Sequence, residues 1–199
     1  MRVLVACEFS GRVRDAFLAR GHQAWSCDLL DTEVSGPHLI GDVRKYLDAS
    51  WDLMIAHPPC TYLTNAGVRH LHAETVGRAG GRALVFGIAR QQAMVQAAGF
   101  FLELLQAHIP KIAIENPIPH RYARRFIGRY DQIIQPWQFG HGETKATCLW
   151  LKNLPPLRAT QYDPGRVQRV HREAPGPDRW KRRSRTYEEI ARAMAEQWG

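Results

Sequence analysis

Residues 2–21 read RVLVACEFSGRVRDAFLARG, and this stretch decides the fold class. A largely apolar and β-branched run from Arg2 to Cys7 predicts a buried strand. Ser10-Gly11 predicts a tight turn, and the helical spacing of apolar residues over 13–17, ended by Gly21, predicts a helix. The chain therefore opens with a strand, a turn and a helix, which together form the building unit of an α/β sheet.

Further strands are predicted where the same apolar character returns. A short strand over 24–27 ends at Asp28, and a third segment lies around Asp42 within 38–47. The remaining strands are expected at 53–56, at 111–114, near 133–134 and at 147–151. A long helix is expected from about Leu84 to Gln106. Strands separated by helical crossovers predict an α/β fold with a mostly parallel, doubly wound sheet.

Two proline motifs limit these strands. The apolar strand over 53–56 is expected to stop at Pro58-Pro59, and the strand over 111–114 is expected to break at Asn116-Pro117. The reason is the same in both places, because proline has no backbone N–H to donate to a ladder.

Length and cysteine usage favour one cytoplasmic domain over residues 1–199. With 45% hydrophobic residues, the chain can bury one good core but not two large ones. The four cysteines form no C-x-x-C pair and lie in or beside apolar runs, which favours a reducing compartment. The sequence has no signal-peptide pattern and no apolar stretch of about 18 residues, so no membrane partner is expected.

The basic charge is concentrated toward the C-terminal end of a chain whose formal net charge is +8. Residues 158–183 form a polar, loop-like insertion, and its last part carries Arg179, Lys181, Arg182 and Arg183 around Trp180. Cations that neutralise phosphates, next to an aromatic face for bases, predict a nucleic-acid contact surface. The alternative is a solvated basic segment that binds nothing specific.

A terminal helix is expected over 186–198. Thr186 and Glu189 have the spacing of a capping box, and Ile190, Met194 and Trp198 share one helical face. That apolar face predicts that the helix docks on the core.

Polar residues follow four of the predicted strands. They are Glu8 to Gly11, Asp28, His57 to Cys60, and Glu115 to Pro117. Because the carboxyl ends of parallel strands meet at one edge of a sheet, we expect these residues to share a ligand-binding crevice. A glycine turn at a helix start lets a ligand approach backbone amides, and a carboxylate at a strand end can accept hydrogen bonds from a ribose. Taken singly, the turn and Asp28 also fit purely structural roles.

The order of these motifs resembles that of the DNA cytosine-5 methyltransferases: a Phe-x-Gly turn, an acidic strand end, Gly-Asp, Pro-Pro-Cys and Glu-Asn. The similarity is greatest to the short phage- and prophage-type members of that family. It is carried by AHPPCTYLTNAG (56–67), AIENP (113–117), FGHGETKATCLWLKNLPPL (139–157) and RTYEEIARAMAEQWG (185–199). The resemblance runs over nearly the whole chain and implies a Rossmann-like, S-adenosylmethionine-dependent methyltransferase acting on DNA.

The resemblance also implies catalytic roles that fit the chemistry of the base. Carbon 5 of cytosine is a poor nucleophile until a thiolate adds at C6, and Cys60 is the expected nucleophile. Glu115 would supply a proton or hydrogen bond to N3, and Asn116 would hold the loop or the base edge. The structural alternative is that Cys60 is a small core residue and Glu115 a surface carboxylate.

Cofactor-binding residues are implied in the same way. The residues expected to bind S-adenosyl-L-methionine are Glu8, Phe9, Ser10, Gly11, Asp28, Asp42 and Pro58. Asp28 would accept from the ribose hydroxyls and Asp42 from the adenine amino group, although Asp42 could also cap a helix that starts near Val43. The remaining cysteines are expected to be core. The histidines show no metal-ligand spacing, so no metal is expected.

DNA contacts are expected from Lys145 and Thr147 together with the basic residues of the 158–183 segment. The chain departs from the family at Val13 and Arg14, which replace further glycines, and at His57, where the large enzymes have glycine. It also has no separate target-recognition domain, so a protein partner for sequence recognition stays open. The target cytosine must be flipped out of a duplex or lie in a single strand.

Two rival functions stay open. The donor could be a modified S-adenosylmethionine that transfers a carboxymethyl group, or the acceptor could be RNA or a nucleotide. Alternatively, the chain could be a non-catalytic nucleic-acid-binding protein with a methyltransferase-like shell.

Overall fold

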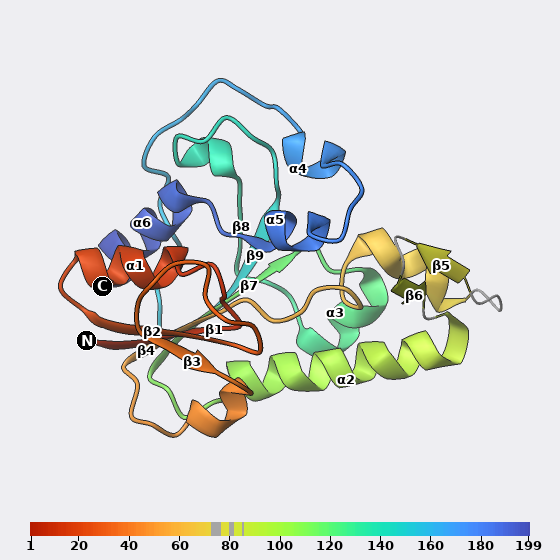
Figure 1. Cartoon of the computed structure of the whole chain (residues 1–199), viewed down its shortest axis with the longest axis horizontal. Helices are drawn as coiled ribbons and strands as arrows, with labels where there is room; N and C mark the ends of the chain where they lie inside the picture. Colours follow the sequence, from red (N-terminus) through yellow and green to blue (C-terminus); the bar gives the residue numbers. More distant parts are fainter. Residues whose placement is uncertain (73–76, 80–81, 85) are drawn as a thin grey trace.

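The computed structural model describes residues 1–72, 77–79, 82–84 and 86–199. Seven strands form one sheet in the order β3-β2-β1-β4-β7-β9-β8 (Figure 1). Their bounds are β1 Arg2–Ala6, β2 Gln23–Asp28, β3 His38–Ile40, β4 Leu53–Ala56, β7 Lys111–Pro117, β8 Gln132–Ile134 and β9 Thr147–Lys152. A separate antiparallel pair consists of β5 (Gly77–Ala79) and β6 (Arg82–Leu84).

Helices cover both faces of the sheet. The α-helices are α1 Arg12–Ala19, α2 Gly87–Leu105, α3 Arg121–Ile127, α4 Arg169–Arg172, α5 Arg179–Ser184 and α6 Glu188–Trp198, and the short 3₁₀ helices are η1 Val43–Tyr46, η2 Asn65–Leu71 and η3 Pro136–Gln138. In Figure 1, α1 and α6 lie together on one face while α2 covers the other. Among the described residues, every helix is too short or too polar to cross a membrane.

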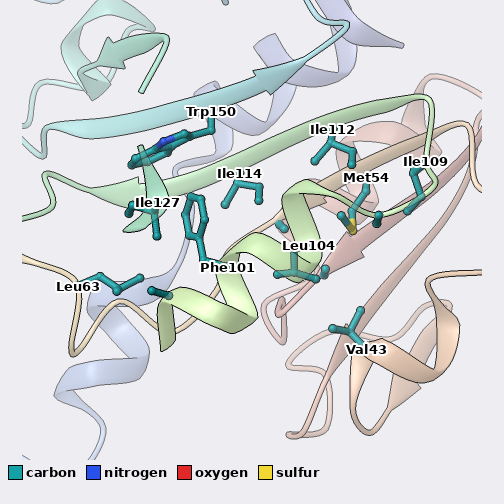
Figure 2. Close-up of a cluster of buried hydrophobic side chains, with 14 of the residues drawn as sticks. Val43, Met54, Leu63, Phe101, Leu104, Ile109, Ile112, Ile114, Ile127 and Trp150 are labelled. Atoms are coloured by element: carbon teal, nitrogen blue, oxygen red, sulfur yellow. The ribbon is translucent and has the colours of Figure 1, made fainter. Parts of the chain in front are cut away.

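Two hydrophobic clusters fill the space between the layers. One lies between the sheet and α2 and includes Met54, Phe101, Leu104 and Trp150, as Figure 2 shows. The ring of Phe101 meets Trp150 edge-on at a centroid distance of 4.9 Å. The second cluster lies under α1 and α6, and in it Ile190, Met194 and Trp198 of α6 are buried on one face. Each face of the sheet therefore has its own core, as a doubly wound arrangement requires.

The expected α/β fold is confirmed, and the sheet is mixed. β3, β2, β1, β4 and β7 pair in parallel, whereas β9 runs antiparallel to both of its neighbours. The chain winds outward from β1 to β3 and then returns to β4 on the other side of β1. Strand order reverses between β1 and β4, and open α/β sheets bind ligands at the carboxyl ends of strands at such a reversal.

Strand β7 continues through Asn116-Pro117, so the expected break at that point was wrong. Residues 115–117 pair with 147–149 of β9, whereas the pairing with β4 ends at Ile114. Beyond Ile114, β7 has a single neighbour, so Pro117 occupies an edge position where its missing N–H leaves no gap in the ladder. The extension carries Glu115 and Asn116 past the end of β4.

Other expected boundaries also differ. The helix expected from about Leu84 starts at Gly87, because Leu84 belongs to β6. The 158–183 segment contains two short helices, α4 and α5, rather than loop alone. The expected capping box is absent: Tyr187 is the N-cap of α6, and Glu189 faces the His141 ring at 3.3 Å instead of the helix start.

Candidate active site

The loop between β1 and α1 is fixed by Glu8. Its buried carboxylate accepts hydrogen bonds from the backbone N–H of Val13 (2.8 Å) and Arg14 (3.2 Å) and from the Ser10 hydroxyl (3.1 Å). A carboxylate at this place satisfies otherwise unpaired amides of the first helical turn and suits the positive end of the helix dipole. The Glu8 oxygens that sequence reasoning assigned to a cofactor are thus engaged by α1.

Gly11 is required by the packing of Arg14. Gly11 has φ +73°, and a Cβ there would lie 2.5 Å from Nη2 of Arg14 and 2.6 Å from Cγ2 of Val34. The Arg14 side chain is fully buried and donates to the hydroxyls of Ser26 and Thr32 and to backbone carbonyls of the 34–35 turn. Gly11 therefore makes room for this guanidinium, which ties the end of the β1 loop to the loop after β2.

The end of β4 places His57 and Cys60. Pro58 is buried between them, and the Cys60 carbonyl accepts from the N–H groups of Leu63 and Thr64. With the fully buried Leu63 as anchor, this turn holds the thiol at the carboxyl end of β4.

The overhanging end of β7 places Glu115 and Asn116 on opposite faces, because side chains alternate along a strand. Glu115 points into the pocket with Cys60. Asn116 is fully buried and donates to the Pro117 carbonyl at 2.6 Å, while its Oδ1 is buried without a partner among the described residues. The two residues expected to act together are therefore separated, and Asn116 does not line the Cys60 pocket.

His57 and Glu115 form a buried pair. Nδ1 of His57 lies 2.7 Å from Oε2 of Glu115, and both side chains are about nine-tenths buried (10% and 11% exposed). Burial opposes ionisation of Glu115, but the hydrogen bond from His57 and the charges of His57 and Lys145 hold its pKa below the usual value. Burial likewise opposes a charged His57, yet Glu115 raises the pKa of the imidazole. The pair is therefore stabilised as imidazolium and carboxylate.

The Cys60 thiol has a raised pKa in this resting state. Burial is the larger cause and the negative charge of Glu115 adds to it, while Lys145 and Arg183 act in the opposite direction. The thiol is thus held mostly protonated until a cation or ligand changes its surroundings.

These groups line one pocket, which we call the thiol pocket. Its cavity volume is about 90 Å³, and it is partly open to solvent. Its lining residues come from the ends of β1, β4 and β7, from the loop before β9 and from the segment 183–186. Phe9, Ser10 and Pro58 are therefore brought together with Cys60, as the shared sheet edge predicts, and Lys145 joins them in the pocket.

The segment around α5 forms one wall of the thiol pocket, close to the end of β7 in Figure 1. Arg185 makes a two-pronged ion pair with Glu33 at 2.8 and 2.6 Å, and the Trp180 ring lies 6.0 Å from that of Phe9. Arg183 lines the pocket, and its buried Nε has no hydrogen-bond partner among the described residues. The basic strip is thus partly built into the site.

The other basic residues of α5 are engaged nearby. Arg179 donates to the Glu173 carbonyl, Arg182 pairs with the Glu173 carboxylate, and Lys181 lies 3.9 Å from Asp178. Thr147, expected to contact DNA, is buried and donates to the Lys145 carbonyl.

A second pocket adjoins the first and shares Cys7 with it. We call it the Asp28 pocket; its lining is Cys7, Cys27, Asp28, Leu29, Gly41, Asp42, Val43, Arg44, Pro59 and Phe100. Burial raises the pKa of Asp28, which accepts one hydrogen bond, from the Leu30 N–H. Asp42 caps η1 through the Arg44 N–H, so the capping role and a place in the pocket coexist. The described residues contain no group of His, Cys, Asp or Glu that could hold a metal ion.

Sequence reasoning missed three contributors. His57 was expected at the ligand-binding edge and as a departure from the family pattern but was given no role of its own, although a histidine at a strand end beside an acidic strand end is a signal of pairing. Cys7 was expected in the core, yet it has φ +58°, is partly exposed and lies between the two pockets. Phe100 belongs to a helix far along the chain, and only the tertiary fold brings it to Asp28.

Comparison with known proteins identifies a shared fold but no matching family and no matching curated protein. A search of protein-family descriptions finds no match, and a search of curated proteins finds none either. Among solved structures, a candidate DNA modification methyltransferase encoded within a prophage in Escherichia coli superposes with a TM-score of 0.50 over 88% of this chain, at 12% identity. The chain shares its fold with that structure. It spans 55% of that protein's length. An Escherichia coli rRNA methylase matches at a TM-score of 0.38 and 16% identity, over 75% of this chain and 55% of its own, a likeness too low to support an argument.

Proposed function

We propose that this protein is an S-adenosylmethionine-dependent methyltransferase that modifies carbon 5 of cytosine in DNA through a covalent adduct with Cys60. The observation that carries the proposal is the thiol pocket, in which Cys60 and the Glu115 carboxylate line the same cavity at the strand-order reversal of the sheet. The fold shared with the prophage-encoded protein supports the proposal that the reaction is a methyl transfer.

The residues of the Asp28 pocket fit the cofactor. Asp28 offers a partly buried carboxylate that lines the pocket and accepts a hydrogen bond from the Leu30 N–H, which suits an acceptor for ribose hydroxyls. Phe100 and Pro59 supply apolar walls for an adenine ring, with Asp42 beside them. When bound there, S-adenosylmethionine would supply an electrophilic methyl group. Phe9 and Ser10 lie in the adjoining thiol pocket, where they would contact the methyl-bearing end of S-adenosylmethionine.

The residues of the thiol pocket fit the activation of cytosine. The Cys60 thiolate would form a bond to C6, and the electron pair displaced from the ring would move toward C5 and N3. Glu115 would deliver a proton to N3, so that no negative charge builds on the ring. After C5 is modified, loss of the C5 proton to water would return its electron pair to the ring, expel Cys60 as a thiolate and restore the aromatic ring. Because the pKa of Cys60 is raised at rest, the thiolate would have to form as the substrate engages, and the charges of Lys145 and Arg183 favour it.

DNA is the proposed partner because the wall of the thiol pocket is cationic. Lys145, Arg183 and Arg185 line it, and α5 continues the positive charge outward. A stacked base could not reach Cys60 in a cavity bordered by this segment, so the target cytosine would be flipped out or presented in a single strand.

Trapping with 5-fluorocytosine tests the proposal. A fluorine at C5 cannot leave as a cation, so DNA that carries it should hold the wild-type protein, with S-adenosylmethionine present, in a complex that survives boiling in detergent. Cys60→Ser should form no such complex. Cys148→Ser is the matched control, because this cysteine is fully buried in β9 and should leave trapping intact.

The outcome also separates the rival functions. Mass spectrometry of nucleosides from treated DNA distinguishes a methyl product from a carboxymethyl product, and parallel reactions with RNA identify the acceptor. If no adduct forms and calorimetry finds no binding of S-adenosylmethionine, the protein is a nucleic-acid-binding shell and the proposal is wrong.

A further inference from the structure

In the His57–Glu115 pair, one ring nitrogen of His57 has no role in the proposed reaction. Nε2 of His57 is buried and has no hydrogen-bond partner among the described residues. A histidine with a purely structural role usually has both ring nitrogens paired, because a buried unpaired polar atom is costly. His57 is instead held by Glu115 through Nδ1 alone, and its ring lines the thiol pocket.

We propose, building on the function above, that His57 is a positioning residue that stores the proton which Glu115 delivers to N3 of the target cytosine. The 2.7 Å contact between Nδ1 and Oε2 allows one proton to belong to the pair rather than to either residue. Glu115 alone would be ionised near neutral pH and would have no proton to give. His57 supplies that proton and holds the carboxylate in place.

The proton and charge balance through the cycle. The Cys60 thiol first loses its proton to solvent, and its electron pair then forms the S–C6 bond. The proton stored in the pair moves to N3 and leaves a neutral imidazole and an ionised Glu115. After C5 is modified, the C5 proton passes to water and its electron pair expels Cys60 as a thiolate. The N3 proton then returns to the pair, the thiolate regains a proton from solvent, and the site is restored.

The surroundings of the pair favour this storage. The charged and titratable groups that act on it are Glu8, Asp28, Cys60, Lys145 and Cys148. The negative charge of Glu8 favours a protonated His57, whereas Lys145 opposes it and favours an ionised Glu115. The geometry of the pair therefore fixes where the proton resides, and the neighbours set how tightly it is held.

Substitution by asparagine separates proton storage from hydrogen bonding. His57→Asn keeps a side-chain N–H near the position of Nδ1 but cannot carry the extra proton. We expect wild-type adduct formation with 5-fluorocytosine DNA to rise about tenfold per pH unit from pH 6 into the neutral range, because the Cys60 thiolate fraction rises while the pair keeps its proton. In His57→Asn the protonated fraction of Glu115 falls by the same factor, so the two trends cancel and the rate should stay level over this range. At neutral pH the loss should reach about 10²-fold or more. His108→Asn, at an exposed position, is the matched control.

A second measurement needs neither cofactor nor DNA. NMR titration of the His57 imidazole in the free protein should give a pKa above the ordinary histidine value, and Glu115→Gln should lower it, since the hydrogen bond and charge of the carboxylate that oppose the effect of burial are lost. An unchanged titration in Glu115→Gln, or a His57→Asn pH profile that runs parallel to wild type, overturns the proton-storage proposal even when adducts form. Failure of the wild-type protein to form any adduct overturns the proposed function instead, and with it the destination of the proton, while the NMR result still reports on the pair.

Discussion

Replacing Gly11 by alanine tests whether this glycine serves the packing of Arg14. Gly21 provides a matched comparison, because it has φ +80° but nothing within 4 Å of the position of a Cβ. Gly21→Ala should therefore show only the strain of a left-handed residue, about 1–2 kcal/mol, less about 0.4–1 kcal/mol from a stiffer unfolded chain.

Gly11→Ala carries the same strain and adds a steric conflict. The new methyl group would lie 2.5 Å from a guanidinium nitrogen that is buried and hydrogen-bonded, and 2.6 Å from Val34. Overpacking of this kind typically destabilises by about 1–3 kcal/mol. We therefore expect Gly11→Ala to lower the free energy of unfolding by about 1–3 kcal/mol more than Gly21→Ala does.

Equilibrium urea unfolding of both variants measures that difference, provided that their m-values agree. Equal losses of stability would refute the packing argument. If Gly11→Ala folded as stably as Gly21→Ala but bound S-adenosylmethionine more weakly, the glycine would serve a ligand instead of Arg14.

Three further variants probe the two pockets and their wall. Asp28→Ala should weaken binding of S-adenosylmethionine by on the order of 1–3 kcal/mol, measured by calorimetry, since the ribose hydroxyls lose their acceptor. Unchanged affinity would mean that Asp28 only ends its strand and does not bind the cofactor. Glu115→Gln should speed alkylation of Cys60 by iodoacetamide at pH 8, because removing the negative charge lowers the pKa of the thiol. Each unit by which this pKa falls raises the thiolate fraction about tenfold. A slower reaction would contradict the electrostatic argument. Arg183→Gln should reduce the log–log salt dependence of DNA binding by about one unit, whereas Arg124→Gln on α3 should not.

The sequence was most informative where one strand and its neighbours determine the local structure. The apolar run Leu53–Ala56 became β4 with the expected bounds, because a fully buried strand needs a continuous apolar stretch and prolines follow it. Pro117 misled for a related reason. Proline breaks a ladder only where its N–H would be needed, and the sequence does not reveal that β4 ends before β7 does.

Parts of the site depend on contacts that no local pattern encodes. The shared edge of a parallel sheet predicts that the residues around 8, 57 and 115 lie close together. The 2.7 Å contact of His57 with Glu115, the burial of Arg14 and the position of Arg183 in the pocket all depend on tertiary packing. The polar composition of the basic segment that carries Arg179 to Arg183 predicts an exposed contact surface. In the structure, Trp180 packs near Phe9 of the β1 loop and Arg185 pairs with Glu33 of the loop after β2, so this segment is anchored against both loops.

The wall formed by residues 183–186 has a consequence for the order of folding. Arg12 donates a hydrogen bond to the Thr186 carbonyl at 2.9 Å across 174 residues of sequence, so the cavity around Cys60 joins the first turn of the chain to nearly the last. Contacts between such distant segments carry the largest loop-closure entropy and form late when local structure forms first. In a refolding chain, Cys27 in β2 should become protected from thiol reagents with the sheet, and Cys60 only after α5 has folded back. Cys60 would then become protected later than Cys27, when the segment that completes its pocket docks.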